Sequence, residues 1–251
     1  MLINQHNFYA GTSGLLLPVP NKTYYPDKFQ SKSRLSYYSS LLNSIEINSS
    51  FYKIPMGSTL TKWALDVPLN FRFTFKLFKE ITHQKGLIFD TSLVSEFFRV
   101  IDHVRDKKGC VLVQLPPSIR INDFAQIRLL AMVLQSNNLH NSWKIAFEFR
   151  HSSLYCDEVY ELLNEFNIGM VLHDKAQSAS PFTDFETDFV YLRFHGPDGN
   201  YRGTYSDAIL QEYASYIDDW LTHKKQVYVY FNNTMGNVYA NLNTIIKCVK
   251  I

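Results

Sequence analysis

The sequence contains little cysteine and no long apolar run. Its three cysteines, Cys110, Cys156 and Cys248, lie far apart. They lack the C-x-x-C spacing of zinc and redox sites, so we expect reduced structural thiols. No apolar run approaches the roughly 18 residues of a transmembrane helix, and the first residues do not follow the pattern of a secretory signal. We therefore expect a cytoplasmic protein without a membrane partner.

The sequence also lacks a large excess of one charge. The net charge is +2, which is too small to indicate nucleic acid or an anionic membrane as a partner. Hydrophobic residues make up 46% of the chain, which is enough for a sizeable core. We therefore expect the whole chain to fold.

Short β-rich runs alternate with helical patterns along the chain. Eight such runs occur, at residues 8–13, 44–48, 71–76, 110–115, 144–149, 168–173, 189–194 and 226–231. Apolar residues at helical spacing occupy 93–104, 124–134, 159–166, 209–221 and 237–249. The interval before the seventh run has little helical pattern. Alternating strands and helices predict an α/β fold with a parallel sheet. Eight strands in a chain of this length favour a TIM-type (β/α)8 barrel, as a single domain over residues 1–251.

The loop after the first run argues against the main alternative, an open doubly wound sheet. Its sequence, GTSG at 11–14, matches neither of the common glycine-rich phosphate motifs that such sheets carry there. The next segment, 15–29, contains three prolines and is predicted to be a surface loop at one end of the barrel.

Polar side chains share one face of the predicted strands. Alternate residues of a strand point to opposite faces, so Glu148 and Arg150 share a face, as do Arg193 and His195. In a barrel the apolar face packs against the helices and the other face points into the lumen. The polar groups near the strand ends are then expected at the C-terminal mouth. They are Glu46, Asn48, Lys76, Gln114, Glu148, Arg150, Asp174, Arg193, His195 and Asn232.

This set of charges has two interpretations. Three acids and three bases could form a mutually paired structural network, because buried charges persist only when paired. Barrel enzymes, however, place their active sites at this mouth. Arg150, Arg193 and Lys76 would then neutralise an anion. The candidate acid and base groups are Glu46, Glu148 and His195.

The loops after the seventh and eighth runs suggest a phosphate site. In barrels this position often binds phosphate above a helix N-terminus. Asn233 or Thr234 could cap the last helix, while Gly196 and Gly236 would allow the backbone to approach a ligand closely.

Histidines near the strand ends raise the question of a metal. His83, His151, His173 and His195 lie there, but no H-x-H or H-E-x-x-H motif is present. Side-chain parity places His151 and His173 on the face opposite Glu148 and Asp174. We expect no metal and no other cofactor, although a divalent metal stays open.

Several strings together resemble the YecE-like family, domain of unknown function 72. They are GTSG, YYP, IEINSSFYKIP, TKW, FTFKLFKEITH, LVQLPPS, FEFRH, LRFHG and VYFNNT, in this order over nearly the whole chain. Leu15 departs from the family, in which an aromatic residue commonly follows GTSG. The resemblance implies a TIM-type barrel. It also implies that the family's motif positions correspond to Glu46, Asn48, Lys76, His83, Gln114, Glu148, Arg150, Arg193, His195, Asn232 and Asn233.

These observations lead to three functional hypotheses. The first is a hydrolase- or lyase-type enzyme that uses acid–base chemistry on a phosphate- or carboxylate-bearing substrate. The second is a nucleic-acid-binding protein of a phosphodiesterase-like kind, in which aromatic residues stack on bases; the candidates are Tyr24, Tyr25, Phe51, Tyr52 and Tyr201. The third is a small-molecule sensor without catalytic activity.

Overall fold

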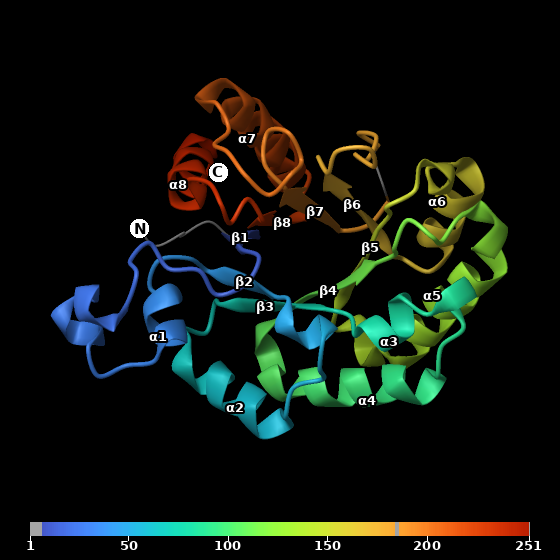
Figure 1. The fold of residues 1–251 in the computed structure, drawn as a ribbon, viewed down its shortest axis with the longest axis horizontal. Coiled ribbons are helices and arrows are strands. Elements are labelled where there is room, and N and C mark those ends of the chain that lie inside the picture. The colour runs from blue at the N-terminus through green and yellow to red at the C-terminus, as the bar shows by residue number, and fades with distance from the viewer. Residues whose placement is uncertain (1–6, 184–185, 251) are drawn as a thin grey trace.

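The strands of the protein form one parallel sheet that curves almost into a closed barrel (Figure 1). The structure is a computed structural model that describes residues 7–183 and 186–250. The other residues of the predicted domain, 1–6, 184–185 and 251, lie outside the described part. The strands are β1 (Phe8–Thr12), β2 (Ser44–Ile47), β3 (Arg72–Lys76), β4 (Lys108–Gln114), β5 (Lys144–Glu148), β6 (Gly169–His173), β7 (Phe189–Phe194) and β8 (Gln226–Phe231). Each predicted run is confirmed as a strand to within two residues.

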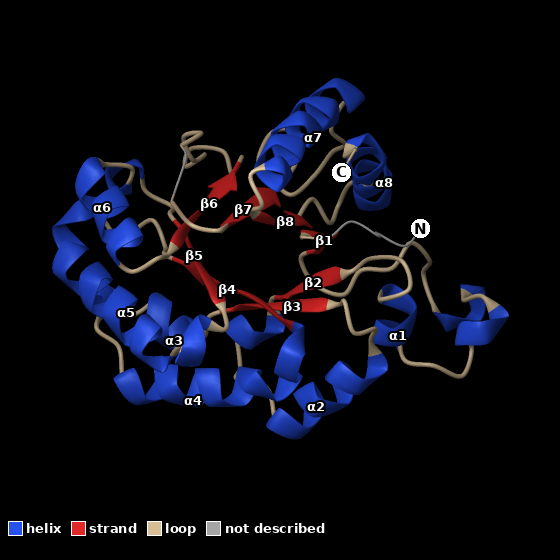
Figure 2. Ribbon diagram, turned by 180° about the vertical axis from the view of Figure 1, so that it is seen from behind, coloured by secondary structure: helices blue, strands red, loops and turns tan. Residues whose placement is uncertain are grey.

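Helices surround the outer face of this sheet (Figure 2). They are α1 (Arg34–Tyr38), α2 (Gly57–Asp66), α3 (Lys79–Thr82), α4 (Thr91–Ile101), α5 (Phe124–Asn137), α6 (Asp157–Glu165), α7 (Asp207–Thr222) and α8 (Val238–Cys248). As predicted, the described residues between β6 and β7 form no helix. Within the described ranges, no helix is long and apolar enough to cross a membrane.

The sheet has the order β1-β8-β7-β6-β5-β4-β3-β2, and side chains complete most of the seam between β1 and β2. Asn43 donates to the carbonyl of Phe8 at 2.8 Å and accepts from the Ala10 amide at 2.9 Å. A Cβ at Gly11 would overlap the carbonyl oxygen of Ser44. Glycine therefore allows the two strands to approach closely enough to close the barrel.

The two faces of the sheet have the predicted parity. Phe73, Phe75 and Phe147 are fully buried in the layer between sheet and helices. The lumen has its own apolar cluster, which includes Leu112, Val171, Tyr191, Tyr228 and Tyr230. The charged residues discussed below lie on the same face of the strands as this cluster, nearer the C-terminal ends.

The segment after β1 forms short helical turns at the edge of the barrel (left in Figure 1). Two 3-10 turns, Lys22–Tyr24 and Asp27–Phe29, follow the prolines. Tyr25 is buried, with its ring 4.6 Å from that of Tyr37. The prediction of a loop at the surface is right for most of the segment, but Tyr25 cannot stack on a nucleic-acid base without leaving the core.

Candidate functional site

A buried arginine links two carboxylates across the lumen. Arg193, on β7, donates from Nη1 to Glu148 on β5 at 2.5 Å and from Nη2 to Glu46 on β2 at 2.8 Å. All three side chains are buried. The predicted convergence of these strands' polar groups is therefore present, and Arg193 lies at its centre.

Both carboxylates are ionised despite their burial. Burial alone would raise the pKa of Glu46, but Arg193 and the hydroxyl groups of Ser13 and Tyr191 outweigh it and lower that pKa. Ser13 donates to Glu46 at 2.6 Å, and Tyr191 donates to its other oxygen. Against the same cost of burial, the guanidinium groups of Arg193 and Arg150 hold the pKa of Glu148 well below its usual range.

Arg150 follows β5 and extends this network toward the surface. Its Nη2 forms a close ion pair with Oε1 of Glu148, but the geometry is not that of a hydrogen bond. Within the described residues, Oε1 of Glu148 and the Nε atoms of Arg150 and Arg193 are buried without a hydrogen-bond partner. Unsatisfied polar groups of this kind are uncommon in folded proteins. The network therefore retains hydrogen-bonding capacity beside the mouth.

His195 is held in one tautomer by its neighbours. Its Nε2 lies 3.3 Å from Nη2 of Arg150 and 3.4 Å from Nη1 of Arg193. Because guanidinium nitrogens only donate, Nε2 accepts and the proton is on Nδ1, which lies 3.3 Å from Asp174. Burial, with a contribution from Arg193, lowers the pKa of His195. The imidazole is therefore neutral at pH 7.

Asp174 lies just after β6 and orients this histidine. It accepts the backbone N–H of His195 at 2.6 Å and the hydroxyl group of Tyr205. Tyr205 in turn accepts the N–H of Gly196 at 2.6 Å. Asp174 thus supports His195 from the loops and is separate from the Glu46–Arg193–Glu148 network.

His173 corrects one sequence-based prediction. It pairs in register with Arg193 and shares the lumen face with it, and its ring lies 5.6 Å from that of His195. The prediction that His173 faces away from Glu148 is wrong, because Asp174, taken as the lumen residue, lies beyond the end of the strand. Nε2 of His173 lies 3.1 Å from the Phe149 carbonyl, and Nδ1 accepts from the Lys175 amide at 3.2 Å.

These contacts leave His173 little capacity to bind a metal. His151 uses its Nδ1 to accept the Ser153 amide at 3.1 Å. In residues 7–183 and 186–250, no group of three or more His, Cys, Asp or Glu side chains is arranged to hold a metal ion.

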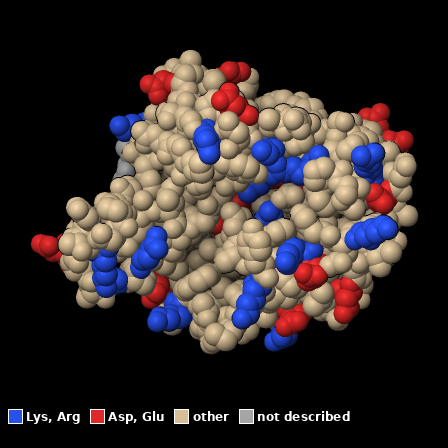
Figure 3. Space-filling view, viewed as in Figure 1, with Lys and Arg blue, Asp and Glu red and all other residues tan. Residues whose placement is uncertain are grey.

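Lys76 is the third cation of the mouth and is only partly buried. Its Nζ donates to Oε1 of Gln114 at 2.7 Å and lies 4.1 Å from the centre of the Phe51 ring. Burial and the charge of Arg193 lower the pKa of Lys76 from 10.5 to about 8. Figure 3 shows basic side chains gathered around a hollow near the centre of one face of the molecule.

Two predicted residues lie at the rim of this region. His83, at the end of α3, is exposed and packs edge-on against Phe51 at 4.8 Å. Asn48 lines an apolar pocket of about 260 Å³ with Leu15 and Trp63. The Oδ1 atom of Asn48 is buried without a partner among the described residues.

Two glycines of the loops after β7 and β8 approach the chain's own backbone closely. A Cβ at Gly196 would overlap the carbonyl of Arg202, and one at Gly236 would overlap that of Gly203. The two loops therefore pack against each other, and the close approach of the glycines serves the chain itself.

The asparagines after β8 have different surroundings from those expected. Asn233 is buried and donates to Gly203 at 2.9 Å and to Asn241 at 3.1 Å. The predicted cap by Asn233 or Thr234 is wrong, because α8 begins after Asn237. Asn232 is half-buried, and its backbone N–H donates to the Phe194 carbonyl at 2.7 Å.

Sequence reasoning missed two partners of the charged network, Ser13 and Tyr205. Strand parity does place a third partner, Tyr191, on the lumen face with Arg193. Ser13 and Tyr205 lie in loops, where no period in the sequence indicates which way a side chain points.

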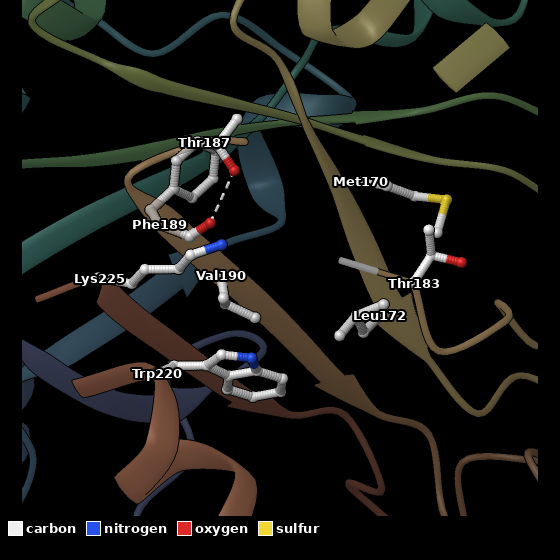
Figure 4. Close-up of a pocket in the computed structure, with 8 residues that line it drawn as sticks. All are labelled: Met170, Leu172, Thr183, Thr187, Phe189, Val190, Trp220 and Lys225. Carbon is white, nitrogen blue, oxygen red and sulfur yellow. Dashed lines mark hydrogen bonds between the residues drawn. The ribbon is translucent and has the colours of Figure 1, made fainter. Parts of the chain in front are cut away.

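A small cavity elsewhere contains no such cluster. It lies beside β6, β7 and α7, and Figure 4 shows its lining, which includes Leu172, Phe189 and Trp220. Among the described residues that line it, one is charged, Lys225. The candidate site is therefore the charged mouth.

The fold and the site define the protein as a parallel α/β barrel with a buried arginine–carboxylate network below its mouth. The family model of a protein of unknown function, DUF72, matches residues 9–246, so the chain belongs to the DUF72 family. The chain is 28% identical to UPF0759 protein YunF of Bacillus subtilis, over 86% of each chain. It is 26% identical to UPF0759 protein YecE of Escherichia coli, over 48% of this chain and 43% of YecE.

Solved structures of this family have the same fold. A DUF72 protein of Enterococcus faecalis, EF0366, has a TM-score of 0.78 at 19% identity and covers 97% of this chain, with 96% of its own chain matched. TM1631 of Thermotoga maritima, also a DUF72 protein, has a TM-score of 0.65 at 22% identity, over 96% of this chain and 98% of its own. At these identities the likeness concerns the fold alone.

Proposed function

We propose that the mouth of the barrel binds a small anion that carries a phosphate or carboxylate group, and that the protein acts on it as a hydrolase- or lyase-type enzyme. The observation that carries this proposal is the charge balance. Arg150, Arg193 and Lys76 supply three positive charges against the two carboxylates of Glu46 and Glu148. The third acid of the mouth, Asp174, contacts His195 and Tyr205 and, among the described residues, forms no ion pair with these three bases. A buried site tolerates such an excess poorly unless an anion shares it.

The arrangement also suggests where the anion binds. Arg193 is occupied by both carboxylates, whereas Arg150 pairs with Glu148 alone and lies nearer the surface. Among the described residues, the contacts of the Lys76 Nζ are a neutral amide and an aromatic ring. Arg150 and Lys76 are therefore the candidates for direct contact, because guanidinium binds planar oxyanions through two donors.

His195 is the best candidate for a proton acceptor. Its tautomer places an unprotonated Nε2 beside Arg150, and Asp174 stabilises the Nδ1 proton. If Arg150 turns toward a bound anion, Nε2 becomes available to a substrate proton. Glu46 and Glu148 are ionised and fully paired, which makes them suited to fixing the arginines and poorly suited to donating protons.

Calorimetric titration with inorganic phosphate and with malonate tests this proposal. We expect measurable binding at low salt, weakened at least tenfold in Arg150→Gln and less in Arg150→Lys, which keeps the charge. Arg128→Gln is the matched control, because Arg128 is an exposed arginine paired with Glu165. Equal affinity of the wild type and Arg150→Gln, or no binding by the wild type, would overturn the proposal.

Measurements on the same purified protein test the other two hypotheses, a nucleic-acid-binding protein and a small-molecule sensor. Binding of a single-stranded oligonucleotide that weakens steeply as salt rises would support a nucleic-acid partner. A metabolite that copurifies and is never converted would support a sensor. Mass spectrometry of copurifying small molecules would identify either that metabolite or a substrate.

A further inference from the structure

The amine of Lys76 has unusual surroundings for a lysine in a charged cluster. It forms no ion pair with a carboxylate of the described residues. Its contacts are the amide oxygen of Gln114 and the face of the Phe51 ring. The charged groups around this amine come from several other parts of the barrel. They are Glu46 on β2, His83 at the end of α3, Glu148 on β5, Arg150 just after β5, and Arg193 on β7.

This environment lowers the pKa of the Lys76 amine, so a larger share of it is neutral than in an exposed lysine. The nearest acids, Glu46 and Glu148, are already paired with guanidinium groups, so their attraction for the ammonium is largely offset. Removal from water and the two arginines then act against the proton on Lys76. Lysines that act as nucleophiles are activated in this way, by desolvation and a neighbouring cation.

We propose that Lys76 forms a Schiff base with the carbonyl group of an anionic substrate whose phosphate or carboxylate binds at Arg150. This inference rests on the proposed function and names the substrate class, an anionic aldehyde or ketone. It fits the lyase type of chemistry, because a protonated imine withdraws electrons from the neighbouring carbon.

The step balances without an added reagent. The ammonium of Lys76 loses one proton, the neutral nitrogen attacks the carbonyl carbon, and a C–N bond forms. The former carbonyl oxygen takes up protons and leaves as water, while nitrogen completes a double bond to carbon and keeps one proton. Ammonium and carbonyl therefore give iminium and water.

The state of the amine decides whether this can occur near neutral pH. A pKa of about 8 leaves about one amine in ten neutral at pH 7. A lysine with the ordinary pKa of about 10.4 has roughly 0.04% of its amines neutral at that pH. Lys76 therefore has about two hundred times more reactive amine than a surface lysine.

Reductive trapping tests the proposal on the full chain. The protein is incubated with sodium pyruvate and sodium cyanoborohydride, which reduces an imine to a stable secondary amine, and labelled peptides are quantified by mass spectrometry. We expect labelling of Lys76 at pH 7 to be at least tenfold faster than labelling of Lys79. Lys79 is the internal control, because it lies nearby and pairs with an acid, Glu80, at 3.9 Å.

Three further measurements make the result specific. The rate at Lys76 should reach half its maximum near pH 8. It should fall at least fivefold when acetone, which has no anionic group, replaces pyruvate, and also in Arg150→Gln. Arg128→Gln should label like the wild type.

The outcomes separate this inference from the proposed function. If phosphate and malonate bind through Arg150 while Lys76 labels no faster than Lys79, the Schiff base is refuted and anion binding stands. If Lys76 labels rapidly but acetone and pyruvate react equally, the anionic substrate class is refuted. The comparison of Lys76 with Lys79 and that of pyruvate with acetone both use the wild-type protein, so neither depends on the folding of a variant.

Discussion

Replacing Lys76 by methionine should remove a pH dependence from the stability of the protein. The pKa of this amine is lowered from 10.5 to about 8, chiefly by burial. Below pH 8 the amine is protonated in both the folded and unfolded states. Between pH 8 and 10.5 the unfolded state still binds the proton and the folded state does not. The free energy of unfolding therefore rises with pH across this window.

The magnitude follows from the displacement of the pKa. At about 1.4 kcal/mol per pH unit, the full displacement corresponds to about 3.4 kcal/mol. Lys76 remains partly exposed, and solvent screening should reduce this to about 1.5–2 kcal/mol. The free energy of unfolding of the wild type, minus that of Lys76→Met, should rise by this amount between pH 7 and 10.5.

Urea unfolding of both proteins at several pH values measures this difference. Titration of the tyrosines and of other lysines is common to both proteins and cancels. Lys79→Met serves as the matched control, because it removes a nearby exposed lysine that pairs with Glu80. A flat difference for Lys76→Met, or one that falls as pH rises, would refute the reasoning about the surroundings of Lys76.

Two other predictions concern the barrel seam and the histidine. Gly11→Ala should lower the free energy of unfolding by about 3 kcal/mol or more, because its Cβ meets backbone of the next strand. Gly86→Ala, where only a positive φ of 62° opposes the side chain, should cost about 1 kcal/mol by the same urea assay; similar costs would contradict this account of the seam. In ¹⁵N-labelled protein at pH 7, NMR should show His195 protonated at Nδ1 alone, and Asp174→Asn should reduce that tautomer. A proton on Nε2 in the wild type would disprove the assignment.

The strands and the charged mouth were predictable because both follow from a period of two residues. Alternation placed Glu148 and Arg193 on the lumen face, and parallel strands brought their ends together. The same counting misplaced His173, because the strand ends there and Asp174 already belongs to the loop. A period gives the direction of a side chain only as far as the strand continues.

Contacts between distant loops were not predictable in the same way. In sequence Asn233 resembles a helix cap. Its side-chain amide nevertheless donates to the backbone carbonyl of Gly203, thirty residues earlier. The close approach at Gly11 depends on how β1 meets β2 where the barrel closes, and no local sequence pattern indicates this contact. These features arise from closure of the barrel, and no spacing of residues in a single sequence indicates which loops that closure brings together.

The distinction between a structural network and a functional site cannot be drawn from the buried carboxylates. Among the described residues, removing Glu148 would leave Arg193 with one carboxylate partner and Arg150 with none, so the protein should lose stability under either interpretation. Lys76 is different, because it adds a positive charge that no carboxylate neutralises directly. If the network served stability alone, an apolar residue at this position would raise the free energy of unfolding. A lysine kept there at a cost in folding free energy is what an anion-binding or nucleophilic role requires, and the pH dependence of Lys76→Met measures that cost directly.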